Sequence, residues 1–135
     1  MPDRIIQTPN APAAIGPYSQ AIEAGGFLFT SGQLGLNPET GMLPPGIEAQ
    51  TKQALQNIRA ILENAGLQTN DIVKTVVFLK SLSDFAVVNE IYATFFGSHK
   101  PARSCIEVSG LPKDGLVEIE VIAKVGNSVE PLNRS

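Results

Sequence analysis

Six segments of this chain have the pattern of a strand and only two have that of a helix, which restricts the fold more than any other feature. In residues 47–65 and 84–96 the apolar side chains recur at helical spacing. The strand-like segments are residues 4–7, 18–23, 27–31, 72–80, 103–108 and 116–125. Their order along the chain, β-β-β-α-β-α-β-β, predicts an α+β fold in which a mixed β-sheet carries two helices on one face.

The other face of this sheet is expected to stay uncovered, because two helices can cover only one face. Residues 72–80 nonetheless present apolar side chains to both faces. In the last strand, alternate positions from Val117 to Val125 are apolar on one face, and Ile122 is apolar on the other. An uncovered apolar sheet face usually marks an association surface. We therefore predict that the protein is a homo-oligomer.

Length and charge restrict the organisation of the chain and its partners. A chain of 135 residues fits a single domain, residues 1–135, and we expect an ordered core from about residue 4 to residue 126 followed by a polar, frayed tail. The net charge of −3 and the scattered basic residues argue against nucleic acid as a partner and give no support for binding to a membrane surface.

The chain shows no targeting or membrane-spanning pattern. Residues 1–4 lack the apolar region of a signal peptide, and no apolar run approaches the roughly 20 residues that cross a bilayer. Cys105 is the only cysteine, so it cannot form an internal disulfide. We expect a soluble, cytoplasmic protein.

Turn-forming residues predict where several elements begin and end. Gly25 and Gly26 are expected to form the turn of a hairpin, and residues 32–46 a long loop. Gly66 is the expected end of the first helix. Ser83 is expected to cap the start of the second helix, because a serine hydroxyl can accept a hydrogen bond from a free backbone N–H.

Two neighbouring strands near the end of the chain carry the residues that suggest chemistry. Arg103 and Cys105 share one face of their strand, and Glu118 and Glu120 share one face of the next. The turn-rich residues 109–115 suggest that the two strands form a hairpin, with Glu118 roughly opposite Cys105 and the residues after it. A cation for an anionic substrate would then lie near a carboxylate able to move a proton, which suggests small-molecule chemistry.

Four motifs extend this pattern over the whole chain. They are residues 14–21 (Ala-Ile-Gly-Pro-Tyr-Ser-Gln-Ala), 30–33 (Thr-Ser-Gly-Gln), 101–105 (Pro-Ala-Arg-Ser-Cys) and 117–120 (Val-Glu-Ile-Glu). In order and spacing they resemble the RidA/YjgF family (reactive intermediate deaminase A; older names endoribonuclease L-PSP and translation-initiation inhibitor). The likeness runs from about residue 5 to residue 125.

The resemblance implies a fold, an assembly and an activity. The fold would be similar to that of the bacterial (bacillus-type) chorismate mutase, with a homotrimer whose sheets form a barrel core and whose ligand sites lie in clefts between subunits. The implied activity is hydrolytic deamination of the 2-imino acids 2-iminobutanoate and 2-iminopropanoate to 2-keto acids and ammonia. No cofactor is expected, and the sequence has no metal-ligand cluster, P-loop or dinucleotide fingerprint.

By the same resemblance, Arg103 and Glu118 are the catalytic residues. Arg103 would hold the substrate carboxylate, since its planar guanidinium fits that group with paired hydrogen bonds. The structural alternative for Arg103 is an ordinary ion pair. Glu118 would position or activate the attacking water, and a partly buried carboxyl can have a raised pKa. Glu120 is its neighbouring competitor for this role.

The resemblance also implies that Tyr18, Ser31, Gly32 and Cys105 bind substrate. Without it, Tyr18 would be taken as a core aromatic and Ser31 as a turn residue. Gly32 would let backbone approach the ligand closely. Cys105 is expected to line the pocket and not to act as a nucleophile, because no histidine pairs with it and water can attack an imine directly.

Several positions around these motifs are left open. For Asn89 on the second helix, the sequence leaves open whether it lies near the site. Phe85 and Tyr92 are expected in the core and His99 in a loop. Lys100, before the Pro-Ala-Arg-Ser-Cys motif, stands where some relatives carry an aromatic residue, so the rim of the cleft and its substrate size preference are unsettled.

Two other functions are compatible with the same residues. The first is a non-catalytic module that binds a 2-keto acid and regulates a partner, because a fold and a pocket do not determine the chemistry. The second is the endoribonuclease or translation inhibitor of the older family names. The acidic balance of the chain argues against the second.

Overall fold

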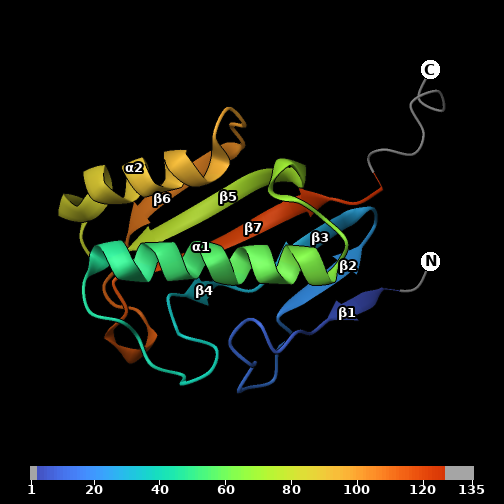
Figure 1. Ribbon diagram of the computed structural model, residues 1–135, viewed down its shortest axis with the longest axis horizontal. Helices are drawn as coiled ribbons and strands as arrows, with labels where there is room; N and C mark the ends of the chain where they lie inside the picture. The colour runs from blue at the N-terminus through green and yellow to red at the C-terminus, as the bar shows by residue number, and fades with distance from the viewer. Residues whose placement is uncertain (1–2, 127–135) are drawn as a thin grey trace.

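The computed structural model describes residues 3–126, which form one mixed β-sheet with two helices against one of its faces (Figure 1). The strands are β1 (Arg4–Ile6), β2 (Ala21–Ala24), β3 (Phe27–Thr30), β4 (Gln33–Leu34), β5 (Ile72–Leu79), β6 (Ala102–Glu107) and β7 (Val117–Lys124). Their order across the sheet is β1-β2-β3-β7-β5-β6, and the short β4 pairs with β7. The predicted α+β fold is confirmed, and β4 is the strand that the sequence analysis missed.

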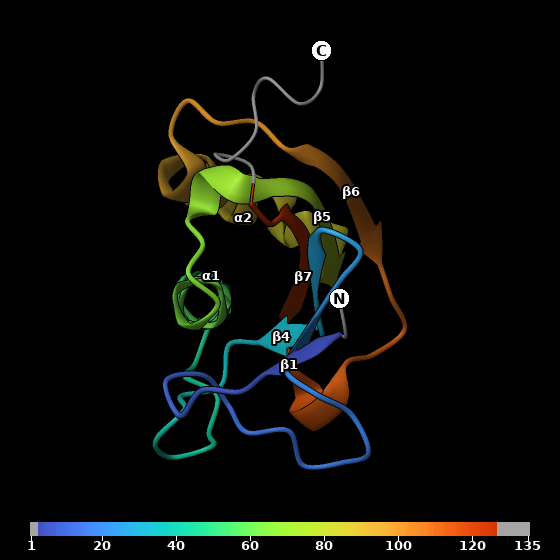
Figure 2. The same ribbon diagram turned by 90° about the vertical axis from the view of Figure 1, so that its right-hand side faces the viewer.

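The helices are α1 (Ile47–Asn64) and α2 (Phe85–Phe96), and both pack on the same side of the sheet (Figure 2). Three short 3-10 turns join the elements: η1 (Thr69–Asp71), η2 (Leu82–Asp84) and η3 (Pro112–Asp114). The apolar stripe of α1 is buried completely or almost completely at Ala54, Leu55, Ile58, Ile61 and Leu62. None of the helices within residues 3–126 is long and apolar enough to cross a bilayer.

The predicted turns at the glycines are confirmed. Gly25 and Gly26 both have positive φ, 60° and 87°, and form the two-residue loop between β2 and β3. Gly66 has a φ of 79°, and its N–H donates to the Glu63 carbonyl (3.0 Å) while that of Leu67 donates to the Leu62 carbonyl (2.8 Å). These two hydrogen bonds satisfy carbonyls that would otherwise have no partner at the end of α1.

The predicted cap at Ser83 is wrong. The α-helix begins at Phe85, and Ser83 lies in the 3-10 turn before it. The hydroxyl of Ser81 accepts a hydrogen bond from the Ser83 N–H (3.2 Å), which stabilises that turn. The physical reason is local: both serines can bond to backbone two residues on, and the first of them does so. The polar tail expected after Gly126 lies outside the described residues.

The alternation predicted for the last strand is confirmed. Val117, Ile119, Val121 and Ala123 of β7 point towards the helices and are at most 2% exposed. On the opposite face, the register aligns Ile5 of β1 with Ile22 of β2, Ile22 with Phe29 of β3, and Phe29 with Ile122 of β7. Ile5 and Phe29 are 65% and 45% exposed. An apolar row therefore crosses the face that no helix covers, and the homo-oligomer predicted from it stays a prediction.

The predicted hairpin of β6 and β7 is wrong, because β5 lies between them. β6 pairs with β5 in parallel, and β7 pairs with the other edge of β5 in antiparallel orientation. The helix α2 connects β5 to β6 and lies on one face, so β6 is placed directly beside β5. The segment that follows passes the end of β5, where Val108 N–H donates to the Leu79 carbonyl (2.9 Å) and Lys80 N–H to the Leu116 carbonyl (3.1 Å).

Candidate active site

Arg103 lies on β6, on the face of the sheet that carries α2. Its Nη1 donates a hydrogen bond to Asn89 Oδ1 (2.7 Å). Its guanidinium carbon lies 4.7 Å from the centre of the Tyr92 ring and 5.5 Å from that of Phe85. These contacts hold the guanidinium plane in place while the side chain stays exposed. A cation held in this way is already oriented to bind a carboxylate through paired hydrogen bonds.

Three residues of α2 make this support for Arg103, and the sequence analysis identified none of them as such. The sequence predicts Phe85 and Tyr92 in the core and leaves Asn89 open. Phe85 is 37% exposed, so the prediction for it is wrong. Tyr92 is indeed buried, and its hydroxyl shares a hydrogen bond with that of Thr75 (2.8 Å). Burial raises the pKa of Tyr92, so the hydroxyl keeps its proton. Residues 85, 89 and 92 follow helical spacing, which was the available signal that they share a face.

Cys105 shares the face of Arg103, as predicted, and is partly buried. Burial raises the pKa of the Cys105 thiol, against a smaller opposing effect of the Arg103 charge. A thiol of raised pKa is a poor nucleophile because the thiolate is the reactive form. The raised pKa agrees with the expectation that Cys105 is not a nucleophile. That Cys105 lines the pocket stays a prediction.

Glu118 lies on β7 and points to the face that no helix covers. It alternates with the buried Val117 and Ile119, whose side chains point towards the helices. Burial of the half-buried carboxyl is the larger cause that raises the pKa of Glu118, and the charge of Glu120 adds to it. A carboxyl with a raised pKa exchanges protons more readily near neutral pH.

Gly32 lies against Glu118. A Cβ atom added at Gly32 would lie 2.6 Å from Glu118 Oε2 and 2.7 Å from its Cδ. No side chain fits there without moving the carboxyl group. The next two residues, Gln33 and Leu34, form β4, and Leu34 aligns with Glu118 in the register of β4 and β7. The short strand that the sequence analysis missed therefore sets the distance between Gly32 and the carboxylate.

Tyr18 lies near the same carboxylate, and Ser31 directly precedes Gly32 in the chain. Tyr18 is 53% exposed, so it is not a core aromatic. With Gly32 and Glu118 it lines a cavity of about 400 Å³. The Ser31 hydroxyl donates to the Ser19 carbonyl (2.6 Å), so its oxygen remains able to accept a hydrogen bond from a ligand.

The structure thus divides the predicted site residues into two groups on opposite faces of the sheet. The Glu118 group is Tyr18, Ser31, Gly32 and Glu118. The Arg103 group is Arg103 and Cys105, together with Asn89 and Tyr92, which were not predicted as site residues. In the register of β5, Arg103 aligns with Thr75, which is fully buried beneath the helices. Glu118 aligns with Phe78, which alternates with Thr75 and therefore faces the other way. The sheet separates the two groups within one chain, contrary to the expectation from a hairpin.

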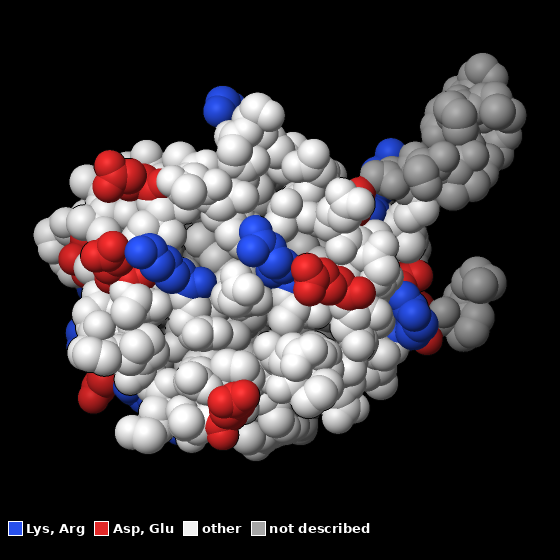
Figure 3. Space-filling model, viewed as in Figure 1, with Lys and Arg blue, Asp and Glu red and all other residues white. Residues whose placement is uncertain are grey.

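The charges on the helix-bearing face are mixed (Figure 3). Basic and acidic side chains lie next to one another there, as in the ion pair of Lys52 with Glu48 (3.2 Å), and no basic stripe is visible on this face. A basic stripe is the usual mark of a nucleic-acid interface. This view therefore gives no support for RNA binding on the helical side.

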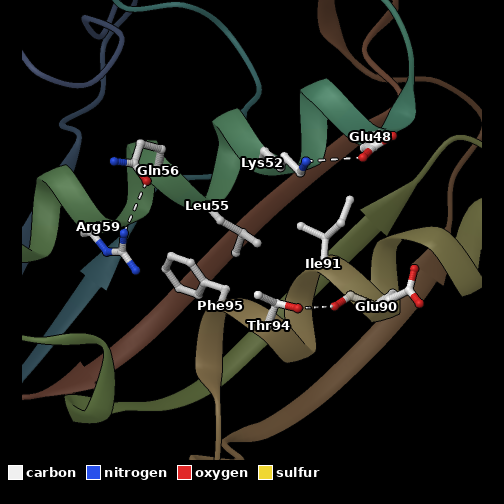
Figure 4. A pocket seen from close by; sticks show the side chains of 9 residues that line it. All are labelled: Glu48, Lys52, Leu55, Gln56, Arg59, Glu90, Ile91, Thr94 and Phe95. Atoms are coloured by element: carbon white, nitrogen blue, oxygen red, sulfur yellow. Dashed lines mark hydrogen bonds and ion pairs between the residues drawn. The ribbon is translucent and has the colours of Figure 1, made fainter.

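A further hollow lies between α1 and α2 (Figure 4). Its cations already have partners: Lys52 pairs with Glu48, and Arg59 lies 4.7 Å from the centre of the Phe95 ring. Leu55 and Ile91 form its apolar sides. The hollow is a weaker candidate than the two groups above because its cations already pair with or pack on neighbouring side chains.

The fold is a mixed sheet with two helices on one face, and the chain carries an exposed, oriented guanidinium and a half-buried carboxyl at motif positions. This is the class of α+β protein that the sequence motifs suggested. A family model described as endoribonuclease L-PSP matches residues 8–125, so the chain belongs to that family. The resemblance inferred from the four motifs is thereby confirmed.

Individual relatives are similar over almost their whole length. The 2-iminobutanoate/2-iminopropanoate deaminase of Escherichia coli (strain K12) is 54% identical over 123 residues, which are 89% of this chain and 96% of that protein. The crystal structure of the yjgF gene product from E. coli has a TM-score of 0.86 and 53% identity, and the match covers 90% of this chain and 98% of that one. E. coli TdcF, whose crystal structure contains bound serine, has a TM-score of 0.87 and 47% identity, with coverage of 90% and 98%.

Proposed function

We propose that the chain hydrolyses 2-imino acids such as 2-iminobutanoate and 2-iminopropanoate to the 2-keto acid and ammonium. In the balanced reaction, R–C(=NH2⁺)–COO⁻ and water give R–CO–COO⁻ and NH4⁺. The observation that carries the proposal is the pair of complementary groups: a guanidinium oriented by Asn89 and Tyr92, and a Glu118 carboxyl whose pKa is raised by burial. The activity of the E. coli relative, at 54% identity, supports the same reaction.

In this proposal Arg103 binds the substrate carboxylate and Glu118 moves the protons. Glu118 takes a proton from water as the water oxygen bonds to the imine carbon, and returns it to the nitrogen. It then takes the hydroxyl proton as the C–N bond breaks and the C=O bond forms. Ammonia leaves with that proton as ammonium, which restores the carboxylate. Ser31 and Tyr18 orient the substrate, and Cys105 lines the pocket.

We further propose that each site forms between subunits of a homotrimer, with Arg103 from one subunit and Glu118 from its neighbour. Two observations support this arrangement. The sheet separates the two groups within one chain, and the apolar row from Ile5 to Ile122 lies on the face that has no helix. Contact between the uncovered sheet faces of neighbouring subunits would bury that row.

The proposal includes a cytoplasmic location, since a single cysteine that makes no internal disulfide suits a reducing compartment. Ribonuclease activity is supported by the description of the family model alone, and no feature of the described residues favours it. The chain has 13 acidic against 10 basic residues, and its helical face carries mixed charge.

A coupled assay tests the function. A PLP-dependent threonine dehydratase generates 2-iminobutanoate in the presence of semicarbazide, which traps the imine that the protein does not hydrolyse. We expect the wild type to speed formation of the keto acid and Arg103→Ala to lose this effect. Arg59→Ala is the matched control, because Arg59 also lies over an aromatic ring but belongs to the hollow between the helices. Full activity of Arg103→Ala, at unchanged oligomer mass, would contradict the role of Arg103.

The same assay distinguishes the deaminase from the alternative function, a non-catalytic module that binds a 2-keto acid. If the wild type fails to outcompete semicarbazide on several imines but binds 2-oxobutanoate by calorimetry, the module that regulates a partner is the better description. If it succeeds and Glu118→Gln does not, the enzyme is supported.

A further inference from the structure

The hollow beside Arg103 is lined by a second cationic side chain, that of Lys100. Lys100 and Arg103 line one hollow of about 410 Å³ at the C-terminal end of α2, together with Asn89, Tyr92 and His99. None of the described residues that line this hollow is acidic. Lys100 is the position that the motif comparison left unsettled at the rim of the site.

Neither cation is neutralised by the part of the chain that the structure describes. Among residues 3–126, the ion pairs are those of Arg4 with Glu23 and Lys52 with Glu48. Lys100 and Arg103 therefore carry two positive charges into the same hollow without a carboxylate at ion-pair distance. Such a hollow attracts a ligand with more than one negative charge.

The other polar groups of the hollow are occupied by structural contacts. The Asn89 oxygen accepts from Arg103, and the Tyr92 hydroxyl bonds to Thr75. His99 lies 2.7 Å from the Ile72 carbonyl through Nε2, and its backbone N–H donates to the Phe96 carbonyl (3.1 Å). These contacts of His99 attach the loop before Lys100 to both β5 and α2. The backbone of Lys100 thus starts from a fixed point, while its long side chain can adjust to a ligand.

We propose that Lys100 makes the site prefer imino acids with a second carboxylate, such as 2-iminosuccinate and 2-iminoglutarate. Arg103 binds the carboxylate next to the imine carbon, and the Lys100 ammonium binds the carboxylate at the end of the side chain. As a substrate preference, this inference rests on the proposed deaminase function. The binding of the second carboxylate by Lys100 can be measured without turnover. The simpler role for Lys100 is to complement the negative C-terminal end of α2. That role would affect substrates of both kinds equally.

Binding of stable keto acids tests the preference without catalysis. Calorimetry with 2-oxoglutarate and with 2-oxobutanoate compares the wild type, Lys100→Met and Lys52→Met. We expect the wild type to bind 2-oxoglutarate about tenfold more tightly than 2-oxobutanoate. Lys100→Met should lose most of this ratio of affinities, because a charge-assisted contact to the second carboxylate is removed. Lys52 lies in the hollow between the helices, so Lys52→Met should keep the ratio of the wild type. An equal ratio in the wild type and Lys100→Met overturns the inference.

Turnover separates this inference from the proposed function. Amino-acid oxidases generate the imines of glutamate and of 2-aminobutyrate, with semicarbazide as the competing trap. The measured quantity is kcat/KM for the glutamate imine divided by kcat/KM for the 2-aminobutyrate imine. A fall of this ratio by about tenfold in Lys100→Met supports both the deaminase function and the preference for a second carboxylate. If the protein hydrolyses neither imine yet shows the Lys100-dependent binding ratio, the deaminase proposal fails and the preference stands. If it hydrolyses both and Lys100→Met changes them equally or not at all, the preference fails and the deaminase stands.

Discussion

Gly32 is the residue on which the position of Glu118 depends most directly. A methyl group at Gly32 would overlap the Glu118 carboxyl, at 2.6 Å from Oε2. We expect Gly32→Ala to lower kcat by roughly ten- to a hundredfold, because small displacements of a catalytic group are costly. The coupled imine assay measures this. Gly110→Ala is the matched control, since a Cβ atom at Gly110 meets nothing within 4 Å. Equal activity of the two variants would show that the Glu118 position is unimportant.

Glu120 should tune the proton transfer without performing it. The carboxylate form of Glu118 accepts the proton from water, so kcat/KM should rise with pH through the pKa of Glu118. The charge of Glu120 raises that pKa, so Glu120→Gln should lower it and move the rising limb to lower pH. The pH profiles of wild type and Glu120→Gln measure this shift. If Glu120→Gln is inactive and Glu118→Gln active, the two roles are reversed.

At the scale of elements, α2 has two separable tasks, to close the core and to orient Arg103. Tyr92→Phe removes the hydroxyl that bonds to the buried Thr75 but keeps the ring beneath Arg103. We expect it to lower the free energy of unfolding by about 1–3 kcal/mol, because the Thr75 hydroxyl is left unpaired, with little change in KM. Urea unfolding and imine kinetics measure the two effects.

The companion variant Asn89→Ala should do the opposite. It removes the hydrogen bond to Arg103 Nη1 at the partly exposed end of the side chain. We expect KM to rise about tenfold with little change in the urea midpoint, since the lost bond involves a charged group that binds substrate. A loss of stability as large as that of Tyr92→Phe, at unchanged KM, would show that Asn89 only supports the fold.

Elements differ in how far the sequence predicts them. The stripe of α1 and its end at Gly66 follow from neighbours along the chain, and both were predicted correctly. The pairing of β6 could not be predicted in the same way. The turn-rich residues 109–115 suit a hairpin, but β5 and α2 place β6 at the sheet edge and β7 on the other side of β5.

At the scale of the whole molecule, the separation of Arg103 from Glu118 predicts complementation between inactive chains. Arg103→Ala and Glu118→Gln are each expected to be inactive. If neighbouring subunits share each site, a co-refolded equal mixture contains sites with both residues intact, about one quarter of the total for random assembly. Activity near that fraction of the wild type, measured with the imine assay, supports the shared site.

The separately refolded variants, mixed only after assembly, are the control for that experiment and should stay inactive. Light scattering reports whether the mixture has the mass of the wild-type oligomer. No recovery of activity in co-refolded oligomers of wild-type mass would mean that each site uses residues of one subunit. The role of the uncovered apolar row in assembly would then need a different explanation.

The sequence by itself determined most local features of this protein: the helices and all strands but the short β4, the two-residue turn at Gly25, the alternation of β7 and the four motifs that mark the family. These depend on backbone preferences and on spacing between near neighbours. Only the tertiary structure decided which strand lies beside β6, and so that Arg103 and Glu118 face opposite sides of one sheet. That choice depends on the direction of the crossover through α2 and on packing between segments distant in the chain, which no local pattern records.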